Sequence, residues 1–595
     1  MMSLVPEIAP GVSVAILADD LLVVVENEDA RPLTGRLFPL ILPLVDGRRS
    51  VAEIADALDG RATIADVAVG VEELVEERAL AAAGSDPRRT IWIEPIFGGG
   101  PSDPCRRCLQ LRLDEMFAVT RYLAQHYPDR ALIRSPRRPA AAPHVPGRAG
   151  NVLYTLDTGT GVFTPHRVVR RPDCPDCGGS TTVVEEPQPL DRHVDPITGV
   201  VHSLRLWSRD DVPAHMVVAE HVFPPEIEFV ESIWRRCRRR TAAGGATLEQ
   251  ARAGAIGEAI ERYSGVYRRT DRGRRATYTV LDETAIHPNR VMGFSAGQLR
   301  DRVRWNRRHP SRFARVAEPF CEQTEYAWTR LRPLDGGAER WLPTACCYYG
   351  AEPESERRSC FGGSNGCAAG TTFEDAIVRG FLEAVERDAV GIWWHNRIER
   401  RGVDLATVPD EFVRSVAAAY ERFGRTLCVL NVTTDLGVPC FAAVSRDSAT
   451  GALTTLGFGA HFDAREALRH ALREINLFLP ELLENRRRSL FDGEPSGAYL
   501  EPTDRAPWSA SDWPSYATDP LTQVRRTAAA HGLEVLVLDQ TRSDLGVPVA
   551  RVVVPDLCHF WPRYGHARLS SVPIVMGWRR AITAETDLNP ALILL

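Results

Sequence analysis

Apolar and polar positions near the start of the chain first form two short runs. The runs from Val12 to Leu17 and from Leu21 to Val25 flank a turn at Asp19-Asp20, which predicts two strands. Apolar residues then recur at helical spacing from Leu37 to Val45, and this pattern ends at Asp46-Gly47. The first part of the chain is therefore predicted to be two strands followed by a helix.

Two further helices are predicted from the residues that begin them. Ser50 with Glu53 and Thr63 with Asp66 have the spacing of capping boxes, and each pair precedes apolar residues at helical spacing. Two strands and three helices within residues 1–90 predict a winged helix.

The charge of residues 1–90 distinguishes between nucleic-acid binding and peptide binding, the two functions expected of a winged helix. This segment contains 16 acidic residues and 8 arginines, a formal net charge of −8, which a nucleic-acid backbone would repel. A winged helix can instead bind an extended peptide along an exposed strand edge. We therefore expect peptide binding here and no nucleic-acid binding.

The rest of the chain predicts two further parts. Residues 91–188 include a loop or linker at 135–149 that is rich in Pro, Arg and Ala. Strand-like runs alternate with amphipathic helices over 189–595, which predicts one large mixed α/β domain. The polar, Pro-rich stretch 485–521 is predicted to be a surface excursion or lid. The clearest strand-like runs are 327–331, 427–432 and 549–554.

Composition narrows the class of protein. The 595 residues, of which 44% are hydrophobic and 25% charged, are typical of a globular protein of two to four domains. No apolar run approaches the ~20 residues of a membrane helix, and the first residues lack a signal-peptide pattern. We therefore expect a cytoplasmic protein without membrane contact. The sequence contains no lysine, which excludes a Walker A loop and a pyridoxal-phosphate Schiff base.

Four of the 13 cysteines have the spacing of metal ligands. Cys105 and Cys108 form one C-x-x-C pair, and Cys174 and Cys177 form another. Two such pairs complete a tetrahedral shell of thiolates, which leaves no position for water, so we expect a structural Zn²⁺. The alternative, four unrelated reduced cysteines, is disfavoured by the paired spacing. The other cysteines, among them Cys346, Cys347, Cys360 and Cys367, lack such spacing.

A motif with two carboxylates occurs twice. Glu258–Arg262, with the sequence E-A-I-E-R, recurs 125 residues later as Glu383–Arg387, with the sequence E-A-V-E-R. Residues three apart share a helix face, so each motif presents two carboxylates side by side. If both pairs face one cleft, divalent cations bound to phosphate oxygens would hold them together. The alternative, two solvated helix faces, is disfavoured by the repetition.

A glycine-rich stretch, Gly362–Thr372, precedes the second motif and would let backbone amides approach an anion. With the motif it resembles the central signature of the YcaO superfamily, specifically the cyclodehydratases of azole- and azoline-containing ribosomal peptides. The resemblance covers about 189–595. Residues 1–90 and the cysteine pairs resemble the leader-peptide recognition element and zinc module fused to such enzymes. The segments that carry the resemblance are Asp191–Leu204, Gly363–Trp394, Gly457–Arg465 and Glu474–Asn476.

The resemblance implies ATP-dependent ring formation. A Cys, Ser or Thr side chain of a ribosomal precursor peptide attacks the preceding amide, ATP phosphorylates the oxyanion, and loss of phosphate leaves a thiazoline or oxazoline. ATP and Mg²⁺ are the implied cofactors, beside the structural Zn²⁺. No catalytic residue is assigned. The residues that match the family's ATP and magnesium site are Glu258, Glu261, Arg262, Ser364, Asn365, Glu383, Glu386, Arg387, Arg465 and Glu474.

The resemblance also implies partners. The leader of the precursor peptide would bind residues 1–90. A flavin-dependent azoline dehydrogenase, a second cyclodehydratase component and a second copy of the chain in a homodimer are candidate partners that the sequence leaves open.

Four positions depart from the family pattern. Family members usually carry Lys where this chain has Gly244-Gly245, Ser at Gly254, Asn at Thr371 and Gln at Leu477. These departures keep a second function open, namely a degenerate scaffold that binds the precursor peptide for a separate cyclodehydratase. Thioamide formation by a related mechanism is disfavoured by the N-terminal fusion. The arginines that could replace the missing lysine are Arg235, Arg236 and Arg238–Arg240.

Overall fold

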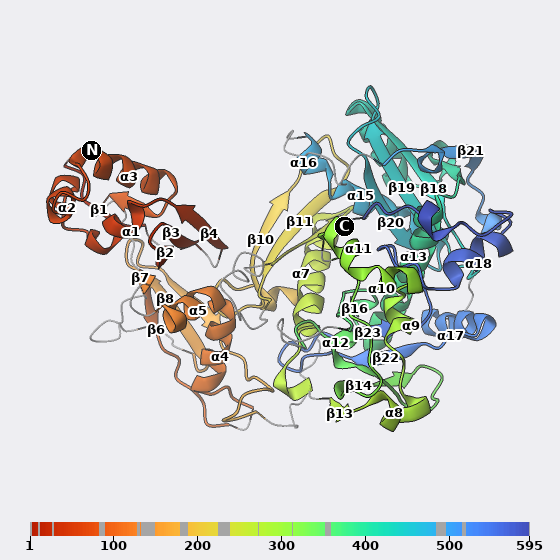
Figure 1. The fold of residues 1–595 in the computed structure, drawn as a ribbon, viewed down its shortest axis with the longest axis horizontal. Coiled ribbons are helices and arrows are strands. Elements are labelled where there is room, and N and C mark those ends of the chain that lie inside the picture. The colour runs from red at the N-terminus through yellow and green to blue at the C-terminus, as the bar shows by residue number, and fades with distance from the viewer. Residues whose placement is uncertain are drawn as a thin grey trace. The chain divides into compact units, whose positions relative to one another are not determined.

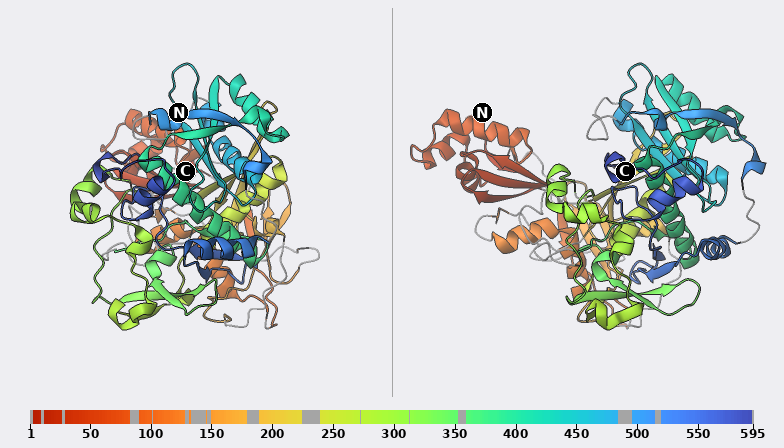
Figure 2. Two further views of the ribbon diagram at one scale, coloured as in Figure 1. Left: turned by 90° about the vertical axis from the view of Figure 1, so that its right-hand side faces the viewer. Right: turned by 45° about the vertical axis from the view of Figure 1, so that its right-hand side comes forward.

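The computed structural model divides the chain into two compact units. The first comprises Met1–Val184, Asp195–His202 and His221–Arg239, and the second Glu185–Val194, Ser203–Glu220 and Arg240–Leu595. Figure 1 shows their helices and strands, and Figure 2 shows the same ribbon from two further sides. The structure describes residues 3–9, 12–26, 29–82, 90–100, 102–127, 131–132, 145, 149–178, 189–223, 239–271, 273–311, 313–351, 359–483, 495–513 and 519–593.

The first unit begins with an antiparallel meander followed by short helices (Figure 1). The predicted strands and both capping boxes are confirmed. The predicted helix over 37–45 is wrong in its continuity: it is one α-helical turn followed by a 3₁₀ turn, because Pro43 has no amide hydrogen to continue the α-helical pattern. These elements are β1 (Pro6–Ile8), β2 (Val12–Ala18), β3 (Leu21–Glu26), β4 (Asp29–Thr34), α1 (Phe38–Ile41), η1 (Leu42–Leu44), α2 (Val51–Ala57), α3 (Ile64–Glu76) and β5 (Leu80–Ala82).

Side chains that alternate along the meander point to opposite sides of its sheet, and both sides are apolar. Val14, Leu22 and Val24 pack with buried residues of α1, α2 and α3. The opposite face, which includes Ala15 and Val23, packs against α5. The short strand β7 also pairs with β2. Residues beyond position 90 therefore complete the core of the N-terminal sheet. The remaining elements of this unit are β6 (Thr90–Ile93), α4 (Arg106–Met116), α5 (Ala118–His126), β7 (Ala131–Leu132), β8 (Val152–Asp157) and β9 (Phe163–Arg167).

Strands of the second unit form two larger sheets and most of a three-stranded one. The predicted strand-like runs 327–331, 427–432 and 549–554 correspond to β14, β18 and β23. The six-stranded sheet contains β13 (Arg274–Ala276), β14 (Tyr326–Pro333), β15 (Arg340–Pro343), β16 (Cys367–Ala369), β22 (Leu536–Asp539) and β23 (Val549–Val553). The five-stranded sheet, in spatial order, contains β20 (Thr455–Ala460), β19 (Cys440–Asp447), β18 (Arg425–Asn431), β17 (Arg400–Asp404) and β21 (Pro502–Pro507). The three-stranded sheet contains β10 (Val201–Trp207), β11 (His215–His221) and β12 (Arg239–Gly245).

Helix α13 lies between the two larger sheets (Figure 1). Trp393 and Trp394 pack with residues of β18, β19 and β20, whereas Phe381 and Val385 pack with residues of β22 and β23. The apolar residues on several sides of this helix explain its burial. The α-helices of this unit are α7 (Leu248–Ser264), α8 (Tyr278–Leu281), α9 (Asn289–Met292), α10 (Ala296–Arg300), α11 (Arg302–Arg308), α12 (Thr344–Cys347), α13 (Phe373–Asn396), α14 (Glu411–Arg422), α15 (Ala464–Asn476), α16 (Leu479–Leu483), α17 (Pro520–His531) and α18 (Arg568–Val575). The 3₁₀ turns outside the first unit's meander are η2 (Leu190–His193), η3 (Arg269–Asp271), η4 (Asp282–Thr284), η5 (Leu405–Thr407), η6 (Ala498–Leu500), η7 (Ala510–Asp512) and η8 (Glu585–Asp587).

The predicted surface excursion at 485–521 is wrong for residues 495–513. Strand β21 pairs in parallel with β17 at the sheet edge, where prolines are tolerated. Tyr499 and Leu500 are only 3% and 0% exposed and belong to the core, because their apolar surface packs on the five-stranded sheet. Much of the predicted linker at 135–149 and the arginines at 235, 236 and 238 lie outside the described residues.

Candidate functional site

Helices α7 and α13 carry the repeated carboxylate motif, and both pack against β16 (Figure 1). Each begins at a threonine N-cap, Thr247 or Thr372, whose hydroxyl accepts a hydrogen bond from the backbone three residues later. Both helices also carry apolar residues that are buried. They are Ile256, Ile260 and Tyr263 on α7, and Phe381, Leu382 and Val385 on α13.

Each arginine of the motif holds its own two carboxylates. Arg262 lies 3.1 Å from Glu258 and 3.6 Å from Glu261. On α13, Arg387 donates to Glu386 at 2.7 Å and to Glu383 at 3.2 Å. The repetition seen in the sequence is therefore also a repetition of contacts.

A fifth carboxylate, Glu474 of α15, is held beside these two pairs by strand β20. This strand is the edge strand of its sheet among the described strands, so alternate backbone amides are left for side chains to bind. The amide of Phe458 donates to Glu474 of α15, and that of Ala460 donates to Glu386. Helices α13 and α15 both pack on β20, which brings Glu474 towards the acidic pairs.

The carboxylates raise one another's pKa values. Burial and the charge of Glu386 raise the pKa of Glu474 to about 8. Burial, with Arg262 opposing it and Glu383 adding to it, raises the pKa of Glu261 well above its usual value. Burial and Glu383 likewise raise the pKa of Glu386, against the opposing charge of Arg387. A cluster that resists ionisation in this way is suited to divalent cations, which stabilise the charged forms.

These residues line a cavity of about 1730 Å³ within the second unit. Ten acidic residues and five arginines are among the described residues of its wall, so an anionic ligand would meet an excess of negative charge. Cations bridging ligand and protein would remove that repulsion. The charged wall residues are Glu258, Glu261, Arg262, Glu374, Asp375, Arg379, Glu383, Glu386, Arg387, Asp463, Arg465, Glu466, Arg473, Glu474 and Asp519.

The structure brings eight of the ten predicted site residues together on this wall. They are Glu258, Glu261, Arg262, Glu383, Glu386, Arg387, Arg465 and Glu474. Ser364 and Asn365 are not among its lining residues. Their loop contacts Glu383, whose carboxylate accepts a hydrogen bond from the Gly366 amide at 3.1 Å. Gly366 has a φ of +79°, and a Cβ there would lie 2.0 Å from the Val552 carbonyl oxygen, so this close approach requires glycine.

Each of the four departures from the family pattern places at least one residue on the same wall. The chain has small or apolar residues where polar ones are usual, which changes the wall without closing the cavity. They are Gly244, Gly254, Thr371 and Leu477. Arg240, one candidate to replace the lysine, forms an ion pair with Glu220 at 3.0 Å and is not a lining residue.

Sequence reasoning missed several residues that support or line the site. Tyr349 accepts a hydrogen bond from Arg262 at 3.3 Å, and buried Arg551 donates to the Gly363 carbonyl and to Cys367 at 3.1 Å. Trp508 and Trp513 line the cavity with ring centroids 5.6 Å apart. Two tryptophans within a polar stretch of sequence were the only local pattern that could have predicted Trp508 and Trp513 as site residues. No local pattern pointed to Tyr349 or Arg551.

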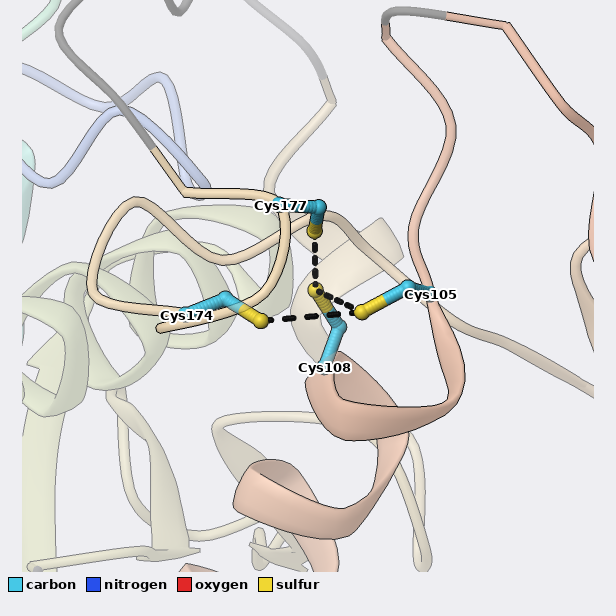
Figure 3. Close-up of side chains that lie close together, drawn as sticks. All are labelled: Cys105, Cys108, Cys174 and Cys177. Carbon is cyan, nitrogen blue, oxygen red and sulfur yellow. Dashed lines mark hydrogen bonds between the residues drawn. The ribbon is translucent and has the colours of Figure 1, made fainter.

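The two C-x-x-C pairs converge in the first unit (Figure 3). Sulfur–sulfur distances are 3.3 Å for Cys108–Cys177, 3.6 Å for Cys105–Cys174 and 3.9 Å for Cys105–Cys108. A tetrahedral shell with bonds of about 2.3 Å places sulfurs roughly 3.8 Å apart. These four thiols can therefore hold one metal ion.

Local structure orients the four thiols. Cys105 is the N-cap of α4 and Cys108 lies in its first turn, where the helix dipole favours negative charge. The backbone amide of Arg171 donates to the Cys108 sulfur at 3.3 Å, and the Arg171 guanidinium binds Glu115 at 2.6 Å. This network ties the second pair of cysteines to α4.

Comparison with known proteins identifies the family. The sequence profile described as YcaO cyclodehydratase, ATP- and Mg²⁺-binding, matches residues 242–558. The chain belongs to the YcaO cyclodehydratase family.

Solved structures and a further sequence extend this assignment. A heterocyclase in complex with substrate and cofactor is 25% identical, with a TM-score of 0.76 over 98% of this chain and 99% of its own. The heterocyclase TruD is also 25% identical, with a TM-score of 0.65 over 99% of each chain. An uncharacterised protein of Methanothermobacter thermautotrophicus is 27% identical over 53% of this chain and 81% of its own length. The fold is that of a multidomain mixed α/β heterocyclase. No helix among the described residues is long and apolar enough to cross a membrane.

Proposed function

We propose that the protein uses ATP and Mg²⁺ to convert Cys, Ser or Thr residues of a ribosomally made precursor peptide into thiazoline or oxazoline rings. The observation that carries this proposal is the convergence of both acidic pairs and Glu474 on one cavity. Mg²⁺ held by these carboxylates would neutralise the triphosphate of ATP and the charge that develops during phosphoryl transfer. In this proposal Glu258, Glu261, Glu383 and Glu386 bind the metal, and Arg262 and Arg387 orient them.

The size of the cavity supports this reading. Small-molecule pockets commonly measure roughly 300–1,000 Å³, whereas this cavity measures about 1730 Å³. It therefore has room for a nucleotide together with a segment of peptide. The solved heterocyclase that resembles the whole chain is in complex with substrate and cofactor, which supports the same arrangement here.

We assign the other parts of the chain to recognition and stability. Residues 1–90 act as a winged helix that binds the leader of the precursor, for which the net charge of −8 and the open edge of β4 are suited. Residues 91–188 form a module with a structural Zn²⁺ at the four cysteines, and residues 189–595 form the YcaO domain. A flavin-dependent dehydrogenase, a second cyclodehydratase component and a homodimeric state remain part of this proposal.

The test uses the full-length protein with a candidate precursor peptide, ATP and Mg²⁺. We expect the peptide to lose the mass of one water per ring, and this loss to require both ATP and Mg²⁺. Isothermal titration calorimetry with Mg²⁺ and a non-hydrolysable ATP analogue measures the nucleotide site directly. Absence of nucleotide binding at millimolar concentration would overturn the proposal.

One group of observations favours a second function. Gly244, Gly254, Thr371 and Leu477 replace the usual polar residues of the family on the cavity wall. A chain that has lost nucleotide binding would act as a scaffold presenting the precursor to a separate cyclodehydratase. That function predicts leader binding without nucleotide binding, so the same calorimetric experiment separates the two.

A further inference from the structure

One face of α15 lines the cavity. His470, Arg473, Glu474 and Leu477 have the spacing of a single helix face, and all four are lining residues. The side chain of Arg473 is 22% exposed, and its Nε lies buried without a hydrogen-bond partner in the part of the chain that the structure describes. A buried N–H of this kind is costly unless an acceptor reaches it.

The other arginines of the wall are engaged or solvated. Arg262 and Arg387 each hold two carboxylates, and Arg379 binds Asp375 at 2.9 Å. Arg465 is exposed.

Arg473 is held more loosely than these. Its guanidinium is 3.4 Å from Glu466, which Arg469 contacts more closely, at 2.8 Å. Arg473 is therefore the partly buried arginine of the described wall that retains donors for a ligand.

Small residues form the corner of the cavity beside Arg473. A Cβ on Gly244 of β12 would lie 2.9 Å from the Arg473 carbonyl oxygen and 3.6 Å from the Leu477 side chain. A Cβ on Gly254 of α7 would lie 2.8 Å from that of Ala243. These close approaches bring β12 against the last turns of α15 and leave no room for a long cationic side chain at position 244.

His470, the remaining polar neighbour on this face, does not supply a cation at neutral pH. Burial and the positive charge of Arg473 lower the pKa of His470 to about 4. Arg473 is thus the source of positive charge that α15 directs to this corner.

We propose that Arg473 binds phosphate oxygens of the nucleotide at the corner formed by Ala243, Gly244, Gly254 and Leu477. The inference rests on the proposed ATP site and assigns its phosphate-binding arginine. A guanidinium presents planar donors that match phosphate oxygens, and within the described residues Arg473 donates only to Glu466, at 3.4 Å. Through this contact a chain without lysine provides positive charge at the corner where β12 presents Gly244.

The test measures binding of Mg²⁺ with a non-hydrolysable ATP analogue to the full-length protein by calorimetry. Arg473→Gln should weaken binding about 10- to 100-fold, the range expected for a hydrogen bond to a charged group. Arg473→Lys should recover part of the affinity, and adenosine should bind both variants and the wild type equally. Arg469→Gln is the matched control, because Arg469 lies one turn earlier on α15 and pairs with Asp410 rather than lining the cavity.

Each other outcome overturns the inference. If Arg473→Gln binds the analogue as the wild type does, the nucleotide site stands but Arg473 is not its phosphate ligand. If Arg473→Gln weakens adenosine as much as the triphosphate, or if the control Arg469→Gln weakens the triphosphate as much as Arg473→Gln does, the role of Arg473 is structural. If the wild type binds no analogue, both the proposed function and this inference are wrong.

Discussion

Replacing Glu386 by glutamine removes one negative charge from the acidic cluster and keeps the shape of the side chain. Glu386 is 13% exposed, accepts a hydrogen bond from Arg387 at 2.7 Å and one from the Ala460 amide. A glutamine carbonyl can accept the same hydrogen bonds, and Arg387 retains Glu383 at 3.2 Å. The substitution therefore tests the charge rather than the packing.

The expected magnitude follows from the environment of Glu386. Its carboxylate acts with Glu383 and Glu474 in a poorly hydrated wall, where a preorganised charge is worth about 3–4 kcal/mol to a transition state. At about 1.36 kcal/mol for each tenfold change, kcat should fall roughly 100- to 1,000-fold. Leader-peptide binding should be unchanged, because it is assigned to residues 1–90.

The assay follows ATP-dependent loss of water from the precursor by mass spectrometry, beside melting temperatures of the same proteins. Glu374→Gln is the matched control: it makes the same chemical change on α13, at an exposed position of the same cavity. The control should retain most of its activity. Nearly unchanged turnover in Glu386→Gln, or an equal loss in Glu374→Gln, would refute the argument that a buried metal-binding charge is essential.

Three further outcomes are expected. The purified protein should contain one Zn²⁺ per chain, and Cys105→Ser with Cys174→Ser should remove it and destabilise the first unit, since structural zinc contributes on the order of 10 kcal/mol in small domains; metal analysis and thermal unfolding measure both effects. The full-length protein should bind the leader of its precursor more tightly than duplex DNA in fluorescence polarisation, because residues 1–90 carry a net charge of −8. Mg²⁺ should raise the melting temperature more at pH 8.5 than at pH 6 and should release protons on binding, because the folded-state pKa of Glu474 is about 8.

The sign of the pH effect follows from proton binding. Glu474 has an ordinary pKa of 4.5, so between that value and about 8 the folded, metal-free protein binds the proton that the unfolded chain has lost. Stability of the metal-free protein should therefore fall as pH rises through this window. A cation held by the neighbouring Glu383 and Glu386 favours the ionised form of Glu474, so Mg²⁺ binding should strengthen over the same window. Proton release is measured by calorimetry in buffers of different ionisation enthalpy, and its absence would contradict the raised pKa.

Direct outcomes would also contradict the predictions on zinc content and on leader binding. Zinc content that survives loss of Cys105 and Cys174 would place the metal elsewhere. Binding to DNA that exceeds binding to the leader would make the N-terminal segment a nucleic-acid module.

Local spacing in the sequence was enough for features that depend on neighbours along the chain. Both capping boxes are present because their partners are three residues apart, and the two thiols of each C-x-x-C pair can reach one ion because only two residues separate them. The two E-x-x-E-R motifs predicted paired carboxylates on helices, and the structure shows the same arginine contacts in both. Local spacing also failed where proline changes the hydrogen-bond pattern, as at Pro43.

Tertiary structure alone decided which of these features share a wall. Glu474 joins the repeated motif because α13 and α15 pack on the same edge strand, whose unpaired amides hold Glu386 and Glu474. Ser364 and Asn365 are not lining residues, although the amide of the neighbouring Gly366 donates to Glu383.

Contacts between distant residues account for the rest. Gly244 and Leu477, two separate departures along the sequence, meet at one corner of the cavity. Sequence periodicity records which face of an element is apolar. It contains no information on which element packs against that face. That packing decides the positions in the site of Trp508, Arg551 and Arg473.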